Sequence, residues 1–183
     1  MSQKRQVLID TALDLFYKNG INSIGINEIL NVSGVAKRTL YSQFQSKEEL
    51  VLATLQQRHT VFMAWLEQKL SGAENDRDVI DTLFSALGSW FCSKEPMLGD
   101  FRGCLFINTS AEFSESNTEI LRLCRSHKRE VRELIARHLK SDDPLLLDMV
   151  CMLKEGAIIT AGMGENGKVV TEKCIALLAK FAD

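Results

Sequence analysis

Apolar residues recur every three or four positions along almost the whole chain, and this spacing constrains the fold more than any other feature. Residues 4–19 show the pattern clearly and end at Gly20, a residue suited to the left-handed position after a helix. No stretch of useful length alternates apolar and polar residues as a half-buried strand does. The sequence therefore predicts an all-α protein of about nine helices, without an internal repeat.

Capping and turn residues set the expected limits of these helices. Ser46 and Glu49 form a capping box before a long helix, Asn117 is placed to cap another, and Pro96 is expected to end one. Asp143 and Pro144 form a cap followed by proline at the first helical position. The expected helices span residues 4–19, 25–33, 36–44, 47–70, 78–95, 103–113, 118–140, 144–161 and 170–181.

Composition bounds the class of protein. The chain has 183 residues, 45% of them hydrophobic, which suffices for one core or one core with a small second domain. Its start, MSQKRQVLID, lacks the apolar region of a secretion signal, and charged residues interrupt the most apolar segment, 145–163. The sequence therefore predicts a cytoplasmic protein with no membrane partner. The five cysteines form no C-x-x-C pair, so neither a metal site nor a disulfide framework is expected.

A short polar helix follows a glycine turn in the stretch SGVAKRTLYSQFQSKEEL, residues 33–50. A helix, a turn with glycine and a second short helix are the parts of a helix-turn-helix, whose second helix lies in the major groove of DNA. Leu30, Val32, Val35 and Leu40 supply apolar positions that would hold the two short helices together and against residues 4–19. The pattern predicts a DNA-binding domain of three helices.

The other side chains of the short helix are left to face outward, and they are Lys37, Arg38, Thr39, Ser42 and Gln43. Basic side chains there can reach guanine edges or phosphates, and Gln43 can pair with adenine. Tyr41 offers a hydroxyl to phosphate or a ring to a thymine methyl, and Lys47 suits a phosphate beside the next helix start. Charge alone also allows a solvated helical hairpin, because residues 1–50 hold only six Lys and Arg against five Asp and Glu.

Residues 5–52 resemble the DNA-binding domain of the Tet repressor (TetR/AcrR) family of bacterial transcription regulators. The matching elements are ALDLFYKNG, INEILNVSGVAKRTLYSQF and SKEEL. The resemblance implies that the outward-facing residues 37–43 and Lys47 contact DNA, with residues 1–46 as the DNA-binding domain and 47–183 as an effector-binding and dimerisation domain. The family often has Ser or Thr where this chain has Ile24 and Gly25, so Asn27 is our candidate for the phosphate contact there. The family often has Gly at the position of Arg38. We therefore expect Arg38 to contribute to the operator sequence that this protein prefers.

The resemblance further implies a small effector that enters the C-terminal half and releases the operator, with no cofactor. FRGCLFINTSAEF, residues 101–113, resembles a segment under the inducer pocket in one branch of the family. Two polar groups, His127 and Lys128, interrupt an apolar helical face, and either a satisfied core position or a ligand contact would explain them. The full candidate pocket is His59, Phe62, Met63, Leu66, Phe84, Leu87, Phe91, Cys104, Phe106, Cys124, His127, Lys128, Met152 and Ile159.

The expected helix 144–161 is apolar nearly all round, whereas a helix at the edge of a protein needs only one apolar face. Its second face, together with residues 170–181, predicts a homodimer through a four-helix bundle, as the family also implies. The expected interface is Leu146, Val150, Leu153, Ala157, Ile158, Ala161, Ile175 and Leu178.

No catalytic spacing of residues supports an enzyme, and the glycine-rich segment 162–169 follows an apolar helix instead of the strand that a phosphate loop needs. The main hypothesis is a repressor that binds a palindromic operator as a dimer. One alternative is a regulator that senses oxidants or electrophiles through Cys104, which lies beside Arg102 near an expected helix start. Another is a helical adaptor that binds protein and no DNA.

Overall fold

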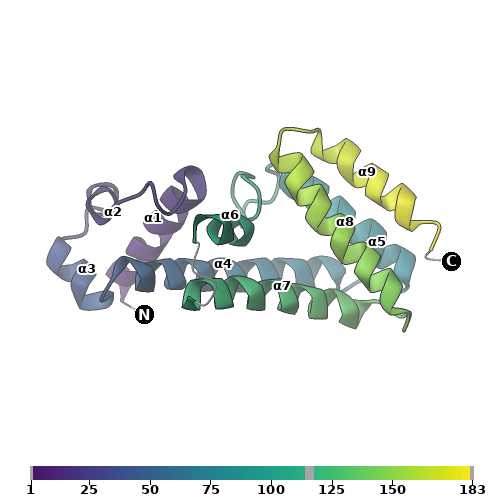
Figure 1. Cartoon of the computed structure of the whole chain (residues 1–183), viewed down its shortest axis with the longest axis horizontal. Coiled ribbons are helices and arrows are strands. Elements are labelled where there is room, and N and C mark those ends of the chain that lie inside the picture. The colour runs from purple at the N-terminus through teal and green to yellow at the C-terminus, as the bar shows by residue number, and fades with distance from the viewer. Residues whose placement is uncertain (1, 114–117, 182–183) are drawn as a thin grey trace. The chain divides into compact units, whose positions relative to one another are not determined.

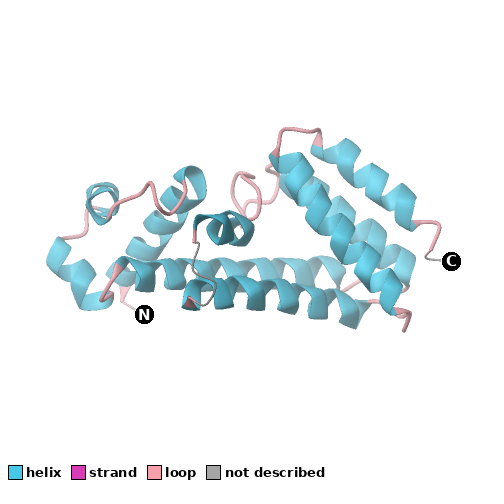
Figure 2. Cartoon of the chain, viewed as in Figure 1, coloured by secondary structure: helices cyan, strands magenta, loops and turns pink. Residues whose placement is uncertain are grey.

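The computed structural model describes residues 2–113 and 118–181, and within these ranges every regular element is a helix (Figure 1). Figure 2 shows the helices joined by loops. The helices are α1 (Gln3–Asn19), α2 (Ile26–Ser33), α3 (Lys37–Gln43), α4 (Lys47–Leu70), α5 (Asp76–Phe91), α6 (Leu105–Glu112), α7 (Glu119–His138), α8 (Pro144–Gly162) and α9 (Gly167–Leu178). The predicted all-α fold with about nine helices is confirmed.

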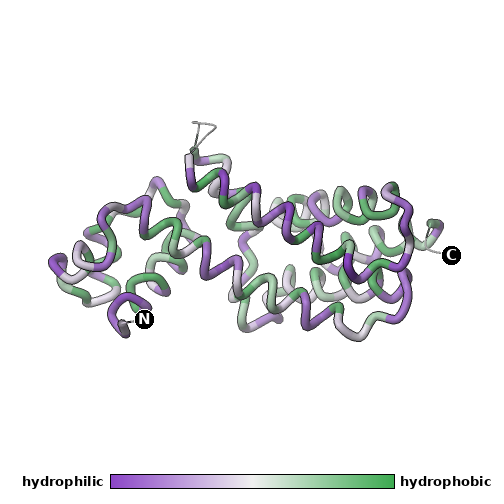
Figure 3. Tube along the Cα trace, turned by 90° about the horizontal axis from the view of Figure 1, so that it is seen from below, coloured by the Kyte–Doolittle hydropathy of each residue, from purple (hydrophilic) through white to green (hydrophobic). Residues whose placement is uncertain are grey.

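Contacts divide the chain into two compact units, each with its own interior. The first unit comprises Met1–Thr60 and Leu105–His127, and the second comprises Val61–Cys104 and Lys128–Asp183, as far as these ranges are described. In both, hydrophilic and hydrophobic residues alternate along the helical trace, as expected of helices that bury one face (Figure 3). The functional division at residues 46 and 47 stays a prediction.

The first unit is built around α1, which packs against α2 and α3. Ser2 caps α1 by accepting the amide hydrogen of Arg5 at 3.2 Å. Leu8, Ala12 and Phe16 form its buried face. Gly20 then takes a φ of 85°, which removes the chain from the helix at little cost because glycine has no side chain to clash. α1 is therefore the support on which the two short helices rest.

In the second unit, α5 packs against α8 and α9, and α8 packs against α9. The contact between α5 and α9 is close, because a Cβ atom built on Gly88 would lie 2.9 Å from Thr171 Oγ1. Asp143 caps α8 by accepting the amide hydrogen of Leu145, with Pro144 at the first position, as predicted. Of the described helices, none is both long and apolar enough to cross a membrane.

α5 ends at Phe91, earlier than the predicted end near residue 95. The cause is Ser93, which takes a left-handed φ of 56° and whose hydroxyl accepts the amide hydrogen of Phe101 at 3.0 Å. The turn brings Glu95 into the interior, where it accepts hydrogen bonds from Trp65 Nε1 and Lys69 Nζ, both at 2.9 Å. The prediction that Pro96 ends this helix is wrong, because the chain turns before proline is reached.

Two helix starts also differ from the prediction. The predicted cap Asn117 lies outside the described residues, and Thr118 Oγ1 accepts the amide hydrogen of Leu121 at the start of α7. α9 begins three residues earlier than expected, because the side chain of Asn166 accepts the amide hydrogens of Lys168 and Val169. The glycine-rich segment thus contains a helix cap.

Candidate DNA-binding surface and effector site

The α2–turn–α3 segment has the geometry of a helix-turn-helix. α2 ends at Gly34, which takes a φ of 67° and donates its amide hydrogen to Leu30 O at 3.0 Å. Leu40 is completely buried and anchors α3 in the first unit. Val32, which was expected among the apolar contacts, is exposed on α2. The turn, Leu40 and the buried Phe44 at the end of α3 therefore fix this helix.

α3 presents a basic and polar surface to solvent. Lys37, Arg38 and Ser42 are exposed, as is Tyr41, with 48% of its surface accessible. Thr39 and Gln43 are half-buried. The four exposed side chains, Lys37, Arg38, Tyr41 and Ser42, form a continuous surface over barely two helical turns, because residues three and four apart are neighbours on a helix.

Some side chains that are predicted to contact DNA form hydrogen bonds within the chain. Ser42 Oγ donates to Thr39 O at 2.7 Å, and Gln43 Oε1 accepts from Ser2 Oγ at 3.2 Å. Asn27 is exposed near the start of α2, where Gly25 provides no side-chain cap. The uncapped amide groups there are available to a phosphate oxygen.

Lys47 has partners within the first unit. Its Nζ donates to Ile21 O at 2.6 Å and lies 5.9 Å from the centre of the Phe16 ring. The predicted capping box is present with one change, because Ser46 Oγ accepts the amide hydrogen of Glu49 while the Glu49 carboxylate accepts that of Gln45. Lys47 therefore ties the start of α4 to the turn after α1, a role that the sequence did not indicate.

Glu112, at the end of α6, holds the turn between α1 and α2. Its carboxylate oxygens accept the amide hydrogens of Ile21 at 2.9 Å and Asn22 at 2.7 Å, and its carbonyl accepts from Asn22 Nδ2 at 3.0 Å. A carboxylate that accepts two backbone amides makes strong, charge-assisted bonds. We refer to this contact as the Glu112 clamp.

Two of the predicted effector residues form a histidine pair in the first unit. His59 Nδ1 on α4 and His127 Nδ1 on α7 lie 3.0 Å apart, and the His127 ring stacks on Phe106 at 3.6 Å. Because a ring nitrogen must donate and the other accept, at least one imidazole carries no hydrogen on its Nδ1 atom. Cys124 is buried on the same helix as His127.

A second polar group lies inside the second unit. Lys128 Nζ on α7 is 2.7 Å from Glu155 Oε2 and 3.4 Å from Cys104 Sγ, and Lys154 bonds the other Glu155 oxygen. Burial would lower the pKa of Lys128, but the neighbouring Cys104 and Glu155 side chains outweigh it and raise that pKa. Sequence reasoning found Cys104 and Lys128 but missed Lys154 and Glu155, although two adjacent charges inside an apolar helix pointed to them.

The remaining predicted pocket residues divide between the interior and the surface. Phe62, Leu66, Phe84 and Leu87 are buried, and Met63 and Phe91 are half-buried. Phe62 and Phe91 belong to a cluster of aromatic rings with Trp65, Trp90 and Phe101, three residues that the prediction missed. Met152 and Ile159 are exposed, and Met152 borders a groove between α8 and α9, so the assignment of both residues to an effector pocket stays a prediction.

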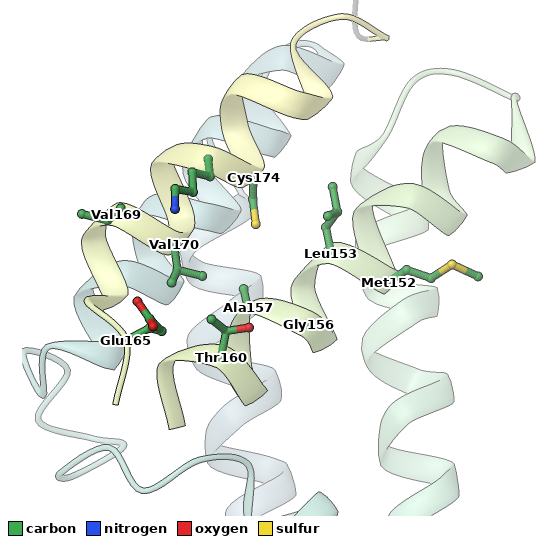
Figure 4. A pocket seen from close by; sticks show the side chains of 10 residues that line it. Met152, Leu153, Gly156, Ala157, Thr160, Glu165, Val169, Val170 and Cys174 are labelled. Carbon is green, nitrogen blue, oxygen red and sulfur yellow. The ribbon is translucent and has the colours of Figure 1, made fainter. Parts of the chain in front are cut away.

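α8 and α9 border a groove of about 450 Å³ (Figure 4). Its lining residues include Met152, Leu153, Ala157, Val170 and Cys174, and the Met152 side chain points away from α9. Of the predicted dimer residues, Leu153, Ala161 and Ile175 are half-buried, whereas five are buried within the single chain: Leu146, Val150, Ala157, Ile158 and Leu178. These five fill the core of the single chain, and the dimer interface stays a prediction. The exposed apolar side of α8 is instead Leu145, Met152, Ile159 and Met163.

In the described part of the chain, no three side chains of the metal-ligating types come together. What the site offers is a short basic helix held by a glycine turn, followed by a helical body with buried polar groups. This combination defines a helix-turn-helix protein with a second helical unit.

Comparison with known proteins agrees with this class. Residues 8–54 match the model of the bacterial regulatory proteins of the tetR family. The transcriptional repressor NemR of Escherichia coli K12 is 28% identical over 138 residues, 75% of this chain and 67% of NemR. The fatty acid metabolism regulator protein of Bacillus subtilis is 26% identical over 165 residues, 85% of this chain and 75% of that protein.

Solved structures extend the similarity to the whole chain. SCO4454, a TetR-family transcriptional regulator from Streptomyces coelicolor, matches with a TM-score of 0.82 and 25% identity, covering 98% of this chain and 96% of that chain. The chain belongs to the TetR family of transcription regulators and carries its helix-turn-helix DNA-binding domain.

Proposed function

We propose that this protein is a transcriptional repressor that binds a near-palindromic operator as a homodimer and is released by a small effector in its C-terminal half. The observation that carries the proposal is the exposed side of α3, where Lys37, Arg38 and Tyr41 project from a helix anchored by the buried Leu40. A helix of seven residues can read only a few base pairs, so useful specificity needs two heads.

The second head would come from a second copy of the chain. Leu145, Met152, Ile159 and Met163 lie seven, seven and four residues apart, so they share one side of α8, and Met152 is 72% exposed and Met163 83% exposed. Leu177 on α9 is also exposed. An apolar stripe of this kind is best covered by the same stripe of a partner related by two-fold symmetry.

The Glu112 clamp supports a route from effector to DNA. α6 begins one residue after Cys104 and ends at Glu112, whose carboxylate holds the turn before α2. A shift of α6 that follows effector binding would move this turn, and with it the helix-turn-helix. The effector then needs only a difference in affinity for the two positions of α6 to change the affinity for DNA.

Selection of bound sites from random duplex DNA tests the proposal, followed by titration of the selected site at several salt concentrations. We expect a near-palindrome with half-sites about one helical turn apart, and affinity that falls steeply with salt because Lys and Arg displace counterions from phosphate. Failure to enrich any sequence, with binding that does not depend on salt, would favour the alternative of a protein-binding adaptor. The expected cytoplasmic location follows from the same proposal, because the operator lies there.

A second candidate is a regulator that senses oxidants or electrophiles through Cys104. The observation that favours it is the position of Lys128 Nζ, 3.4 Å from the thiol sulfur, because a nearby ammonium group stabilises a thiolate. Cys104 is nevertheless buried, so small reagents are the ones expected to reach it. The Cys104→Ser variant should keep DNA binding and lose release by electrophiles such as N-ethylmaleimide. Release that survives this change would exclude Cys104, and Cys92, which is exposed, provides the matched Cys92→Ser control.

A further inference from the structure

Two ammonium groups share one carboxylate inside the second unit. Lys128 Nζ donates to one oxygen of Glu155 at 2.7 Å and Lys154 donates to the other, and Lys154 is only 4% exposed. With each group in its usual ionised form, the three side chains carry one positive charge in excess. An uncompensated charge in the interior is costly, because it loses hydration without gaining a partner.

Two described neighbours of the cluster, Asp148 and Cys151, do not supply the missing negative charge. Asp148 is already paired with Arg132, whose Nη2 lies 2.6 Å from its Oδ1, so this pair is neutral. Burial raises the pKa of the Cys151 thiol, which keeps that side chain uncharged. Of the groups recorded around Lys128, only Cys104 is left, and it balances the charge only as a thiolate.

The surroundings of the lysines are apolar on one side and open to solvent on the other. Val150, Ala157 and Ile158, one turn before and after Lys154 on α8, are buried, as is Val131 one turn after Lys128. The side chains of Lys128 and Glu155 are 29% and 33% exposed, which leaves a path from solvent. A ligand that entered here would meet ammonium groups first and hydrocarbon next.

We propose that the cluster of Lys128, Lys154, Glu155 and Cys104 binds the carboxylate of a small monoanionic effector whose remainder is apolar. The anion supplies the missing negative charge, and its apolar part contacts the inner faces of α7 and α8. The consequence for DNA rests on the proposed effector-controlled regulator, whereas the binding of the anion does not.

Hexanoate is a suitable probe, and hexanamide is its matched neutral control, because the two have nearly the same shape and differ in charge. Titration calorimetry on the full-length protein should detect binding of hexanoate and at least about 30-fold weaker binding of hexanamide, as expected when a buried charge partner is lost. Equal binding of the two, or no binding of hexanoate, acetate or benzoate at millimolar concentration, would overturn the proposal.

Three variants test the role of the cluster. Lys128→Met and Lys154→Met each remove one positive charge at similar volume and should abolish the difference between hexanoate and hexanamide. Cys104→Asp places a permanent negative charge beside Lys128 and should exclude hexanoate. Lys168→Met, on an exposed lysine of α9, is the control and should bind as the wild type does. Hexanoate binding that is unchanged in both cluster lysine variants would show that the anion binds elsewhere.

Thermal unfolding separates a ligand site from a purely structural ion cluster. If the excess charge is real, Lys154→Met should unfold at the same or a higher temperature than the ligand-free wild type, and hexanoate should raise the unfolding temperature of the wild type alone. A large loss of stability in Lys154→Met, with no effect of hexanoate on the wild type, would assign the cluster to folding only.

Fluorescence anisotropy with the selected operator completes the test. Hexanoate that binds the cluster and releases DNA supports both the anion site and the proposed function. Hexanoate that binds the cluster while the operator stays bound supports the site and counts against its role as the effector site. The two proposals can therefore fail separately.

Discussion

α3 and α8 bury apolar residues in opposite ways. α3 has seven residues and a single completely buried anchor, Leu40, and it exposes Lys37, Arg38, Tyr41 and Ser42 to solvent. α8 has nineteen residues, with Val150 and Ile158 in the core and Met152 and Ile159 exposed. A helix with one buried side is complete within its own chain, whereas a helix that is apolar on two sides is complete only when something covers the second.

The largest expected effects come from a positive charge on either side of α8. Ala157→Arg introduces the charge into the core and should lower the free energy of unfolding by about 3 kcal/mol or more. Ile159→Arg introduces it on the exposed side, so the chain should stay folded, become monomeric and lose apparent operator affinity by about 100-fold or more, since two linked heads bind far more tightly than one. Light scattering, thermal unfolding and operator titration measure the three quantities.

The two variants control for each other. If Ile159→Arg remains a dimer with wild-type affinity, the exposed side of α8 is not the interface. If Ala157→Arg is as stable as the wild type, the assignment of Ala157 to the core is wrong.

Substitutions on α3 should be smaller in effect and confined to recognition. Lys37→Ala and Arg38→Ala should each weaken binding to the selected operator by about 1–3 kcal/mol if they contact base edges, with little change in the unfolding temperature because both side chains are exposed. Titration of operator and of a scrambled duplex shows whether the loss is specific. Wild-type affinity in both variants would mean that α3 is not the recognition helix.

A change at Lys47 should affect both stability and DNA binding, because this residue was predicted to contact phosphate and also donates to Ile21 O. Lys47→Ala should lower the free energy of unfolding by about 1 kcal/mol, the net value of a typical hydrogen bond, and weaken operator and scrambled duplex alike. Chemical denaturation and titrations at two salt concentrations measure both effects. Lys69→Ala, which removes another paired lysine from α4, controls for the loss of charge. A loss of stability without any change in binding would make Lys47 a structural residue only.

Acidification should weaken the contribution of α8 to the stability of the fold and leave that of α3 unchanged. This is the smallest effect we expect. Burial would raise the pKa of Glu155, but Lys154 and Lys128 outweigh it and hold that pKa below its ordinary value of 4.5. A lowered pKa means that the ionised carboxylate stabilises the fold above pH 4.5, and that this contribution is lost as the pH falls through the folded-state pKa. α3 contains no acidic residue that could respond.

Unfolding temperatures at pH 7 and in the acid range test this. The wild type should lose more stability on acidification than Glu155→Gln, which cannot change its charge. Equal losses in the two proteins would mean that ionised Glu155 does not stabilise the fold.

The sequence predicted the helices and the exposed side of α3 because both depend on local patterns. Helical spacing, the glycine after α2 and the capping residue Asp143 act within a few positions, and they were identified correctly. The buried face of α8 could not be identified in the same way, because hydrophobicity on all sides gives the same pattern whichever side is buried. Ala157 and Met152 were both reasonable choices for an interface or a pocket, and only the packed structure distinguishes them.

Partners distant in the chain were the other part that could not be predicted. Glu95 accepts hydrogen bonds from Trp65 and Lys69, and Glu155 accepts one from Lys128. Glu112 accepts one from a turn 90 residues away in the chain. The sequence alone does not show whether a carboxylate faces water or accepts a hydrogen bond from a buried donor. For this reason the sequence identified Cys104 and Lys128 as candidates, while their partners Glu155 and Lys154 were found only in the structure.

The Glu112 clamp has a consequence for engineering. Its carboxylate binds the backbone amides of Ile21 and Asn22, and backbone amides are present whatever side chains the DNA-binding head carries. A head taken from another regulator would offer the same two donors, provided that it keeps a glycine at position 20, where a Cβ atom would come within 3.3 Å of the Glu112 carboxylate. Because α6 belongs to the same compact unit as the head, a chimera with a foreign head must keep α6, and the clamp should then form with the foreign turn.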